Sequence, residues 1–259
     1  MKNAILATSL ILSFAGMTIQ SAHAENNGKF SLETGMDYST GKYGGTQSTD
    51  ILYVPFTGKY QGSEWTLKLT VPYLRITGPS NVLHGIGATG ATTSTTTTTR
   101  SGMGDVVMSA SHSVYRNLST GFMANLTGKV KLGTASSDQG LGTGKTDYSL
   151  QADLYQVTGK LTTFGTLGYR VYGKPSGYTL NNVFYGDLGS SYKFNQETNG
   201  GAMMILSQKV SSTGSPHAEA LLFLGHKIQK NWNAQGYVLK GFTNSVPDWG
   251  AGVSLAYLL

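Results

Sequence analysis

Acidic and basic side chains recur at alternate positions of segments that otherwise alternate between apolar and polar residues. In the segment 29–38, Glu33 and Asp37 share one face, and apolar side chains such as Leu32 and Met36 share the other. Because side chains alternate between the two faces of a β-strand, we expect the charged residues to face one common interior. These candidate lumen-lining residues are Glu33, Asp37, Glu64, Lys68, Asp105, Lys129, Lys131, Asp147, Asp153, Arg170 and Asp187. They could pair across strands and fill a narrow barrel, or line a water-filled path and set its charge preference. We expect a mixture of the two.

A glycine-rich segment, Gly140–Thr146, invites comparison with a phosphate-binding loop. That motif requires glycine at position 139, where Gln139 stands, and a helix after its lysine, whereas a strand pattern follows here. We therefore interpret the segment as a glycine-rich loop that places Lys145 and Asp147 at the rim of the lumen.

The segment 111–113 combines serine and histidine, the residue types of a nucleophile and its base. The strand alternation places His112 on the outward face and Ser111 and Ser113 on the opposite face. The histidines also lack the spacing of metal ligands. The sequence therefore predicts no enzyme, no metal site and no cofactor, and a barrel enzyme with an outward Ser–His pair is only a third hypothesis.

The clearest strand pattern lies at 64–73, where apolar Leu67 and Leu69 alternate with polar Lys68 and Thr70. Similar segments recur along the chain, and the connections between them alternate between short turns and longer loops. This rule is typical of outer-membrane barrels, in which backbone groups must be paired within the lipid. We predict an all-β fold, a transmembrane antiparallel up-and-down β-barrel of about 12 strands.

The lengths of the connections also predict an orientation. Short connections are expected to be periplasmic turns and long ones external loops. An even number of strands then places both termini in the periplasm. The chain is thus predicted to be an integral protein of the bacterial outer membrane that contacts outer-membrane lipid and the barrel-assembly machinery.

The first residues resemble an export signal. Lys2 precedes a largely apolar stretch, 4–19, and Ala22–Ala24 forms an A-x-A cleavage site. We predict a signal peptide at 1–24 and a mature barrel at 25–259. The 39% of hydrophobic residues is too low for a bundle of membrane helices, and there is no cysteine. The net charge of +6 comes from scattered basic residues, so nucleic acid is not an expected partner.

A long segment, 78–103, separates two predicted strands and contains the threonine-rich run 92–99. Its composition offers little apolar surface to bury. We expect a mobile external loop unless it packs against another part of the protein.

Several stretches resemble a family of bacterial outer-membrane transporters labelled "MetA-pathway of phenol degradation". The resemblance covers nearly the whole predicted mature chain and implies a barrel that passes aromatic or other small hydrophobic compounds. It rests on the order of the stretches Val71–Val82, Gly102–Asp105, Gly142–Tyr148, Gly168–Arg170 and Gly241–Gly250.

Two principal hypotheses for function follow. The first is an outer-membrane channel or transporter for a small-molecule solute, such as an aromatic or hydrophobic compound, with the loop 78–103 tuning access. The second is a barrel without transport, with a structural role or a role in surface binding through the threonine-rich run.

Overall fold

A computed structural model describes residues 28–80, 82–84, 86–88, 96–176, 179–210 and 214–259. The predicted signal peptide, and residues 92–95 of the threonine-rich run, lie outside the described residues. Within the described part of the chain, no helix is long and apolar enough to span a membrane, a finding that concerns helices alone.

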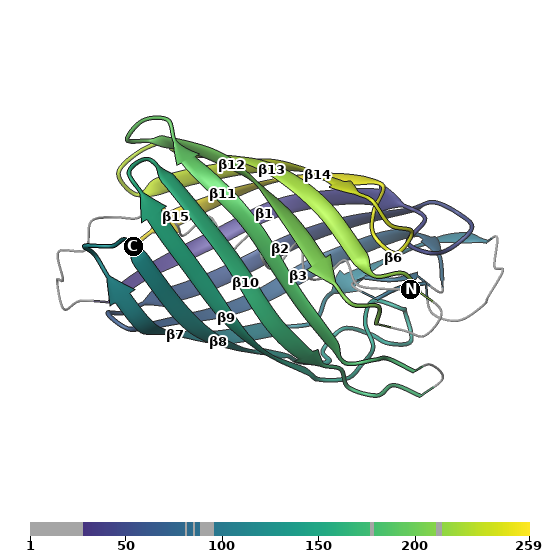
Figure 1. The fold of residues 1–259 in the computed structure, drawn as a ribbon. Coiled ribbons are helices and arrows are strands. Elements are labelled where there is room, and N and C mark those ends of the chain that lie inside the picture. The colour runs from purple at the N-terminus through teal and green to yellow at the C-terminus, as the bar shows by residue number, and fades with distance from the viewer. Residues whose placement is uncertain (1–27, 81, 85, 89–95, 177–178, 211–213) are drawn as a thin grey trace.

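Twelve long strands form a closed antiparallel barrel (Figure 1). Each strand pairs with its neighbours in chain order, and the ring closes where β1 pairs with β15. This confirms the predicted fold. The strands are β1 (Lys29–Gly41), β2 (Thr49–Gln61), β3 (Trp65–Pro79), β7 (Val107–Asn117), β8 (Phe122–Lys131), β9 (Asp147–Thr158), β10 (Leu161–Val171), β11 (Val183–Lys193), β12 (Thr198–Ser207), β13 (His217–Lys227), β14 (Trp232–Gly241) and β15 (Trp249–Leu258).

The two ends of the barrel differ in their connections. Short turns join β2 to β3, β7 to β8, β9 to β10, β11 to β12 and β13 to β14 at one end, which we call the turn end. Longer connections meet at the other end, the loop end. The start of β1 and the finish of β15 both lie at the turn end, because Ser31 pairs with Leu258.

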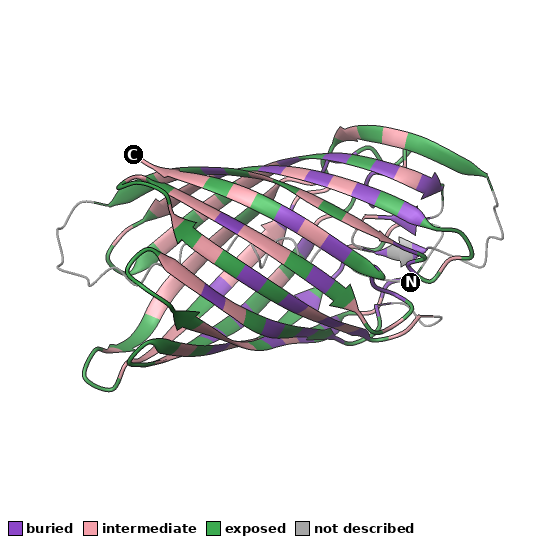
Figure 2. Ribbon diagram, turned by 90° about the horizontal axis from the view of Figure 1, so that it is seen from above, coloured by how far each residue is buried: buried purple, intermediate pink, exposed green. Residues whose placement is uncertain are grey.

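Exposed and buried residues alternate along most strands, as the colouring of Figure 2 shows. The outward face carries exposed apolar side chains such as Leu67, Leu222 and Val253. A barrel with an apolar exterior is suited to lipid. Aromatic pairs flank this belt: Phe30–Tyr60, Trp65–His112 and Trp232–Tyr257 at the turn end, and Tyr38–Trp249 and Tyr169–Phe184 at the loop end. Such girdles are typical of membrane interfaces.

The segment 78–103 differs from the loop that we expected, because its described residues contain paired strands. β3 continues to Pro79, and β6 (Thr97–Met103) pairs with it from Tyr73 to Pro79. Between them, β4 (Val82–Leu83) and β5 (Gly87–Ala88) form a small hairpin. Threonine favours extended structure, and the free edge of the prolonged β3 supplies the hydrogen-bond partner for the last threonines of the run.

Candidate functional site: the barrel lumen

A row of basic side chains crosses the inner wall of the barrel from strand to strand. Lys59 on β2 lies directly opposite Lys68 on β3. Lys68 lies opposite Ser109, and Ser109 opposite Lys129 on β8. The row continues through Ser149 on β9 to Arg170 on β10. We call Lys59, Lys68, Lys129 and Arg170 the basic ladder.

The three lysines of the ladder have no carboxylate within ion-pairing distance among the described residues. Lys59, Lys68 and Lys129 are also partly exposed, unlike most charged groups of the lumen. Like charges directly opposite each other destabilise a sheet. The Lys59–Lys68 pair therefore does not serve to stabilise the fold.

Arg170 is anchored more firmly than the lysines. Its Nε donates to Ser149 Oγ at 3.0 Å, and Nη1 donates to the Tyr172 hydroxyl at 3.4 Å. The guanidinium also lies 5.4 Å from the ring centroid of Tyr185, a cation–π arrangement. Arg170 thus ends the ladder as a fixed positive charge.

Lys131, at the loop end of β8, behaves differently from the ladder lysines. Its ammonium lies 2.5 Å from Asp105 Oδ2 and 3.3 Å from Asp147 Oδ2. Asp105 Oδ1 accepts a hydrogen bond from the Ala135 amide at 2.9 Å, and Asp147 Oδ1 accepts one from the Gly173 amide at 3.0 Å. This ion cluster ties the connections before β7, after β8 and after β10 to the rim.

The carboxylate of Asp153 is satisfied by neutral donors. Oδ2 accepts from Thr127 Oγ1 at 2.7 Å, while Oδ1 accepts from Thr166 Oγ1 at 2.9 Å and from Gln151 Nε2 at 2.5 Å. Three hydrogen bonds hold its negative charge within the wall. Asp153 is only 7% exposed and therefore offers little to a solute.

The other acids of the middle lumen are buried as well. Glu33 and Asp187 are each 7% exposed, and Glu219 is 1% exposed. Asp187 and Glu219 lie on the row that begins at Asp153 and crosses β10 to β13. The three ladder lysines are therefore more exposed than these carboxylates.

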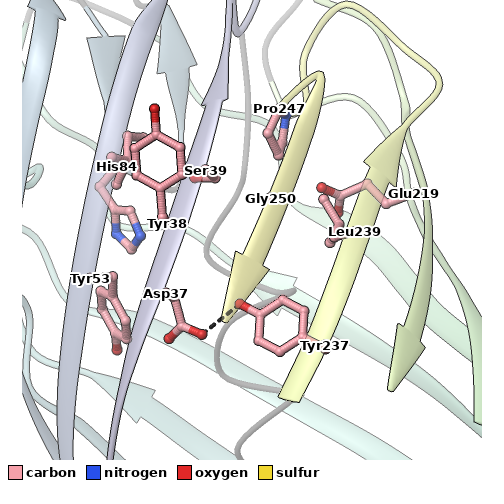
Figure 3. A pocket seen from close by; sticks show the side chains of 11 residues that line it. Asp37, Tyr38, Ser39, Tyr53, His84, Glu219, Tyr237, Leu239, Pro247 and Gly250 are labelled. Atoms are coloured by element: carbon pink, nitrogen blue, oxygen red, sulfur yellow. Dashed lines mark hydrogen bonds between the residues drawn. The ribbon is translucent and has the colours of Figure 1, made fainter. Parts of the chain in front are cut away.

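A cavity of about 30 Å³ lies between β1 and β14 near the loop end (Figure 3). That volume is enough for one or two water molecules. In it, the Tyr237 hydroxyl donates a hydrogen bond to Asp37 Oδ1 at 2.5 Å. Gly252 permits this approach, because a Cβ there would lie 2.3 Å from both Asp37 Oδ1 and Tyr237 Cε1. Ser39, Tyr53, His84 and Glu219 add further polar groups to the lining.

Large apolar side chains line the inner face of β10 to β14. Met203 on β12, Leu221 on β13 and Leu239 on β14 lie side by side across the three strands. Charged side chains share this inner face, namely Arg170 on β10, Asp187 on β11 and Glu219 on β13. The inward cluster consists of Phe164, Tyr185, Met203, Ile205, Leu221, Phe223 and Leu239.

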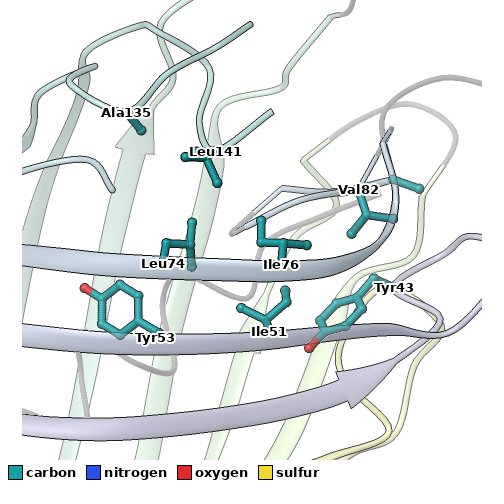
Figure 4. Close-up of a cluster of buried hydrophobic side chains, with 9 residues drawn as sticks. Tyr43, Ile51, Tyr53, Leu74, Ile76, Val82, Ala135 and Leu141 are labelled. Carbon is teal, nitrogen blue, oxygen red and sulfur yellow. The ribbon is translucent and has the colours of Figure 1, made fainter. Parts of the chain in front are cut away.

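A second cluster of buried apolar side chains lies at the loop end (Figure 4). Its strand residues, including Ile51 and Ile76, pack against Val82 of the small hairpin and Leu141 of the β8–β9 loop. On the other side of the hairpin, Leu83 and Ile86 pack with Tyr172, Leu180, Val183 and Val210. The hairpin is therefore a docked part of the barrel mouth, held by apolar contacts on both sides.

Polar contacts also anchor the hairpin. Arg100 on β6 donates hydrogen bonds to the carbonyls of Pro79 and Val82, and the Ala88 amide donates to the Tyr43 carbonyl at 3.1 Å. His84 stacks on Tyr53 with 5.0 Å between the ring centroids. Burial, and secondarily the positive charge of Lys131, lower the pKa of His84 to about 4.

The structure separates the predicted lumen residues into groups. Lys131, Asp105 and Asp147 form the rim cluster, and Lys68, Lys129 and Arg170 belong to the ladder. Glu64 departs from its assigned strand, because it lies exposed in the turn before β3. Lys59 was not predicted, since β2 is apolar on both faces. Glu219 was not predicted either, although the alternation of His217, Glu219 and Leu221 indicates its inward position.

Ser111 and His112 lie on opposite faces of β7. The hydroxyl of Ser111 donates a hydrogen bond to Thr127 Oγ1 within the lumen, whereas His112 lies against Trp65 with 4.6 Å between the ring centroids. This geometry does not form a Ser–His pair. The described residues contain no group of three or more His, Cys, Asp or Glu side chains arranged to hold a metal ion.

No family model matches the sequence, and no curated protein matches it. Among solved structures, the chain is similar to a NanC porin, with a TM-score of 0.57 and 11% identity over 87% of this chain and 98% of the porin. For a KdgM porin the TM-score is 0.49, with 14% identity over 88% of this chain and 98% of the porin. For the CymD monoaromatic hydrocarbon channel the TM-score is 0.48, with 9% identity over 97% of this chain and 92% of the channel. At such identities, the likeness to NanC establishes the porin-type fold.

Proposed function

We propose that the chain is an outer-membrane channel for small molecules, with its short turns in the periplasm and its long loops outside. The observation that carries this proposal is the basic ladder inside a barrel with an apolar exterior. Its three lysine residues are partly exposed and have no ion partner among the described residues. A barrel that only needed to be filled would pair such charges, as it does around Lys131. The proposed solutes include aromatic and other small hydrophobic compounds, as the resemblance of the sequence to outer-membrane transporters implies.

The docked hairpin is proposed to tune access to this lumen. Val82 is fully buried, and Leu83 and Ile86 are nearly so, so their polar replacement should release the hairpin. We expect the triple variant V82S/L83S/I86S to conduct more current than the parent protein in a planar bilayer. Thr98→Ser, an exposed position on β6, is the matched control.

The packing of loops at the loop end favours a second candidate, a closed barrel with a structural or surface-binding role. Conductance of the reconstituted protein separates the two. Stable current steps in the parent protein or in the hairpin variant support the channel. A folded barrel that stays silent in both forms would instead support the structural role.

A further inference from the structure

We infer that the inner wall of the barrel holds a binding site for small oxyanions such as inorganic phosphate. The site is a row of four side chains in direct register across β1, β2, β3 and β7, which we call the oxyanion row. Its members, in order, are Ser31, Lys59, Lys68 and Ser109. The inference goes beyond the proposed function, because a bound anion does not require that the barrel conduct.

The two lysines of the row are close enough to hold one anion together. Lys59 and Lys68 lie directly opposite each other, and opposite residues in an antiparallel pair have Cβ atoms about 5 Å apart. Each ammonium group carries three donors on a flexible four-carbon stem, so both can converge on one oxyanion. Ser31 and Ser109 place a hydroxyl donor beside each lysine.

All four side chains of the row are available to a solute. Each is partly exposed, and none forms a hydrogen bond or an ion pair within the described part of the chain. Like charges directly opposite each other destabilise a sheet, so the stability of the fold does not explain the lysine pair. The donors of the row instead remain open to a ligand of opposite charge.

The inner wall between the row and the turn end is polar and basic. One step closer to that end on the same face, Gln61 pairs with Thr66 on β3 and with Lys29 on β1. Lys29 and Gln61 are exposed, and Thr66 is partly exposed. Positive charge at the mouth of a cleft raises the local concentration of anions. An anion can therefore approach the row from the turn end, away from the docked hairpin.

One carboxylate opposes the binding of an anion at the row. Glu33 lies within electrostatic reach of both lysines, but it is 7% exposed and forms no ion pair with either among the described residues. Lys129 and Asp153 also lie within reach of Lys68 and carry opposite charges. Two ammonium groups therefore outweigh one carboxylate at the row, and removal of the Glu33 charge should tighten anion binding.

The test is equilibrium dialysis of the full purified protein, in a non-ionic detergent at low ionic strength, against radiolabelled inorganic phosphate. We expect saturable binding. The variant K59Q/K68Q should weaken it by at least about tenfold, whereas E33Q should strengthen it by about threefold. K160Q removes an exposed lysine from the turn between β9 and β10, and this matched control should bind phosphate like the parent protein.

Two further measurements sharpen the test. S31A/S109A keeps both charges and removes both hydroxyls, so it should weaken phosphate binding by about threefold, and it tests the row even if K59Q/K68Q does not fold. Sulfate should displace the phosphate at a lower concentration than chloride, because its several oxygens can accept from several donors at once. The heat-dependent mobility of each variant in gel electrophoresis checks that the barrel has folded.

The outcomes separate this inference from the proposed function. Saturable binding that K59Q/K68Q weakens, E33Q strengthens and K160Q leaves unchanged supports the inference. Absence of saturable phosphate binding, or binding that K59Q/K68Q leaves unchanged, would overturn it, as would displacement by chloride as readily as by sulfate. Conductance in planar bilayers decides the proposed channel independently, because a silent barrel can bind phosphate and a conducting barrel can fail to bind it.

Discussion

The rim of the lumen and its middle use the same residue type in opposite ways. Lys131 and Lys129 lie two positions apart on the same face of β8, so both point inward. Lys131 bridges Asp105 and Asp147, whereas Lys129 faces Ser109 and Ser149 across its two neighbouring strands. Charge at the rim holds loops to strands, whereas Lys129 in the middle has no ion partner among the described residues.

Replacing each of the two lysines in turn tests this difference between rim and middle most directly. Lys131→Met leaves Asp105 and Asp147 buried without their cation, so we expect the free energy of unfolding to fall by about 3 kcal/mol. Lys129→Met removes no ion pair, so the change should stay within about 1 kcal/mol. Urea unfolding in detergent micelles, followed by tryptophan fluorescence, measures both. Equal losses for the two variants would contradict the division between rim and middle.

The hydrogen bond between Tyr237 and Asp37 extends the comparison to an acidic group. Gly252→Ala would place a Cβ 2.3 Å from both partners, so the bond must break or the strands must shift. We expect a loss of about 2 kcal/mol in the free energy of unfolding. Gly128→Ala is the matched control, because a Cβ there meets nothing within 4 Å. If both alanine variants unfold at the same urea concentration, Gly252 is not needed for this contact.

Local alternation explains why the rim residues and part of the ladder could be found from the sequence. β1, β3, β8 and β9 each carry polar residues at every second position, so their inward charges are visible in isolation. The ladder itself was not visible, because it depends on register between strands. That register places Lys59 opposite Lys68 and spaces Lys129 from Arg170 by a single serine.

The docking of the hairpin could not be predicted from the local sequence, for a different reason. Val82 and Ile86 stand in a glycine-rich, threonine-rich segment whose composition alone predicts a mobile loop. Their burial depends on surfaces contributed by β2, β3 and β11 and by distant loops. The pairing of β6 with β3 also depends on distant parts of the chain. β6 pairs with the part of β3 that extends beyond its pairing with β7, so the edge that β6 needs is free only there.

A fall in pH should weaken the docking of the hairpin at the loop end through protonation of His84. The pKa of His84 is lowered from 6.5 to about 4 in the docked hairpin. Below pH 6.5 a released hairpin therefore takes up a proton that the docked hairpin does not, so docking is full above that pH and weakens as the pH falls toward 4. The groups that face His84 are Tyr53, Asp37, Glu219, Tyr237 and Lys131.

From these two pKa values, we expect docking of the hairpin to weaken by about eightfold between pH 7 and pH 5.5. Limited proteolysis of the folded barrel, with an acid-stable protease at both pH values, reports the accessible fraction of the hairpin. His84→Phe keeps the stacking on Tyr53 and removes the titrating group, so its cleavage rate, corrected for protease activity, should not change with pH. A parent protein whose corrected cleavage rate is the same at both pH values would show that His84 does not couple protonation to docking, and the apolar contacts of Val82, Leu83 and Ile86 would then hold the hairpin alone.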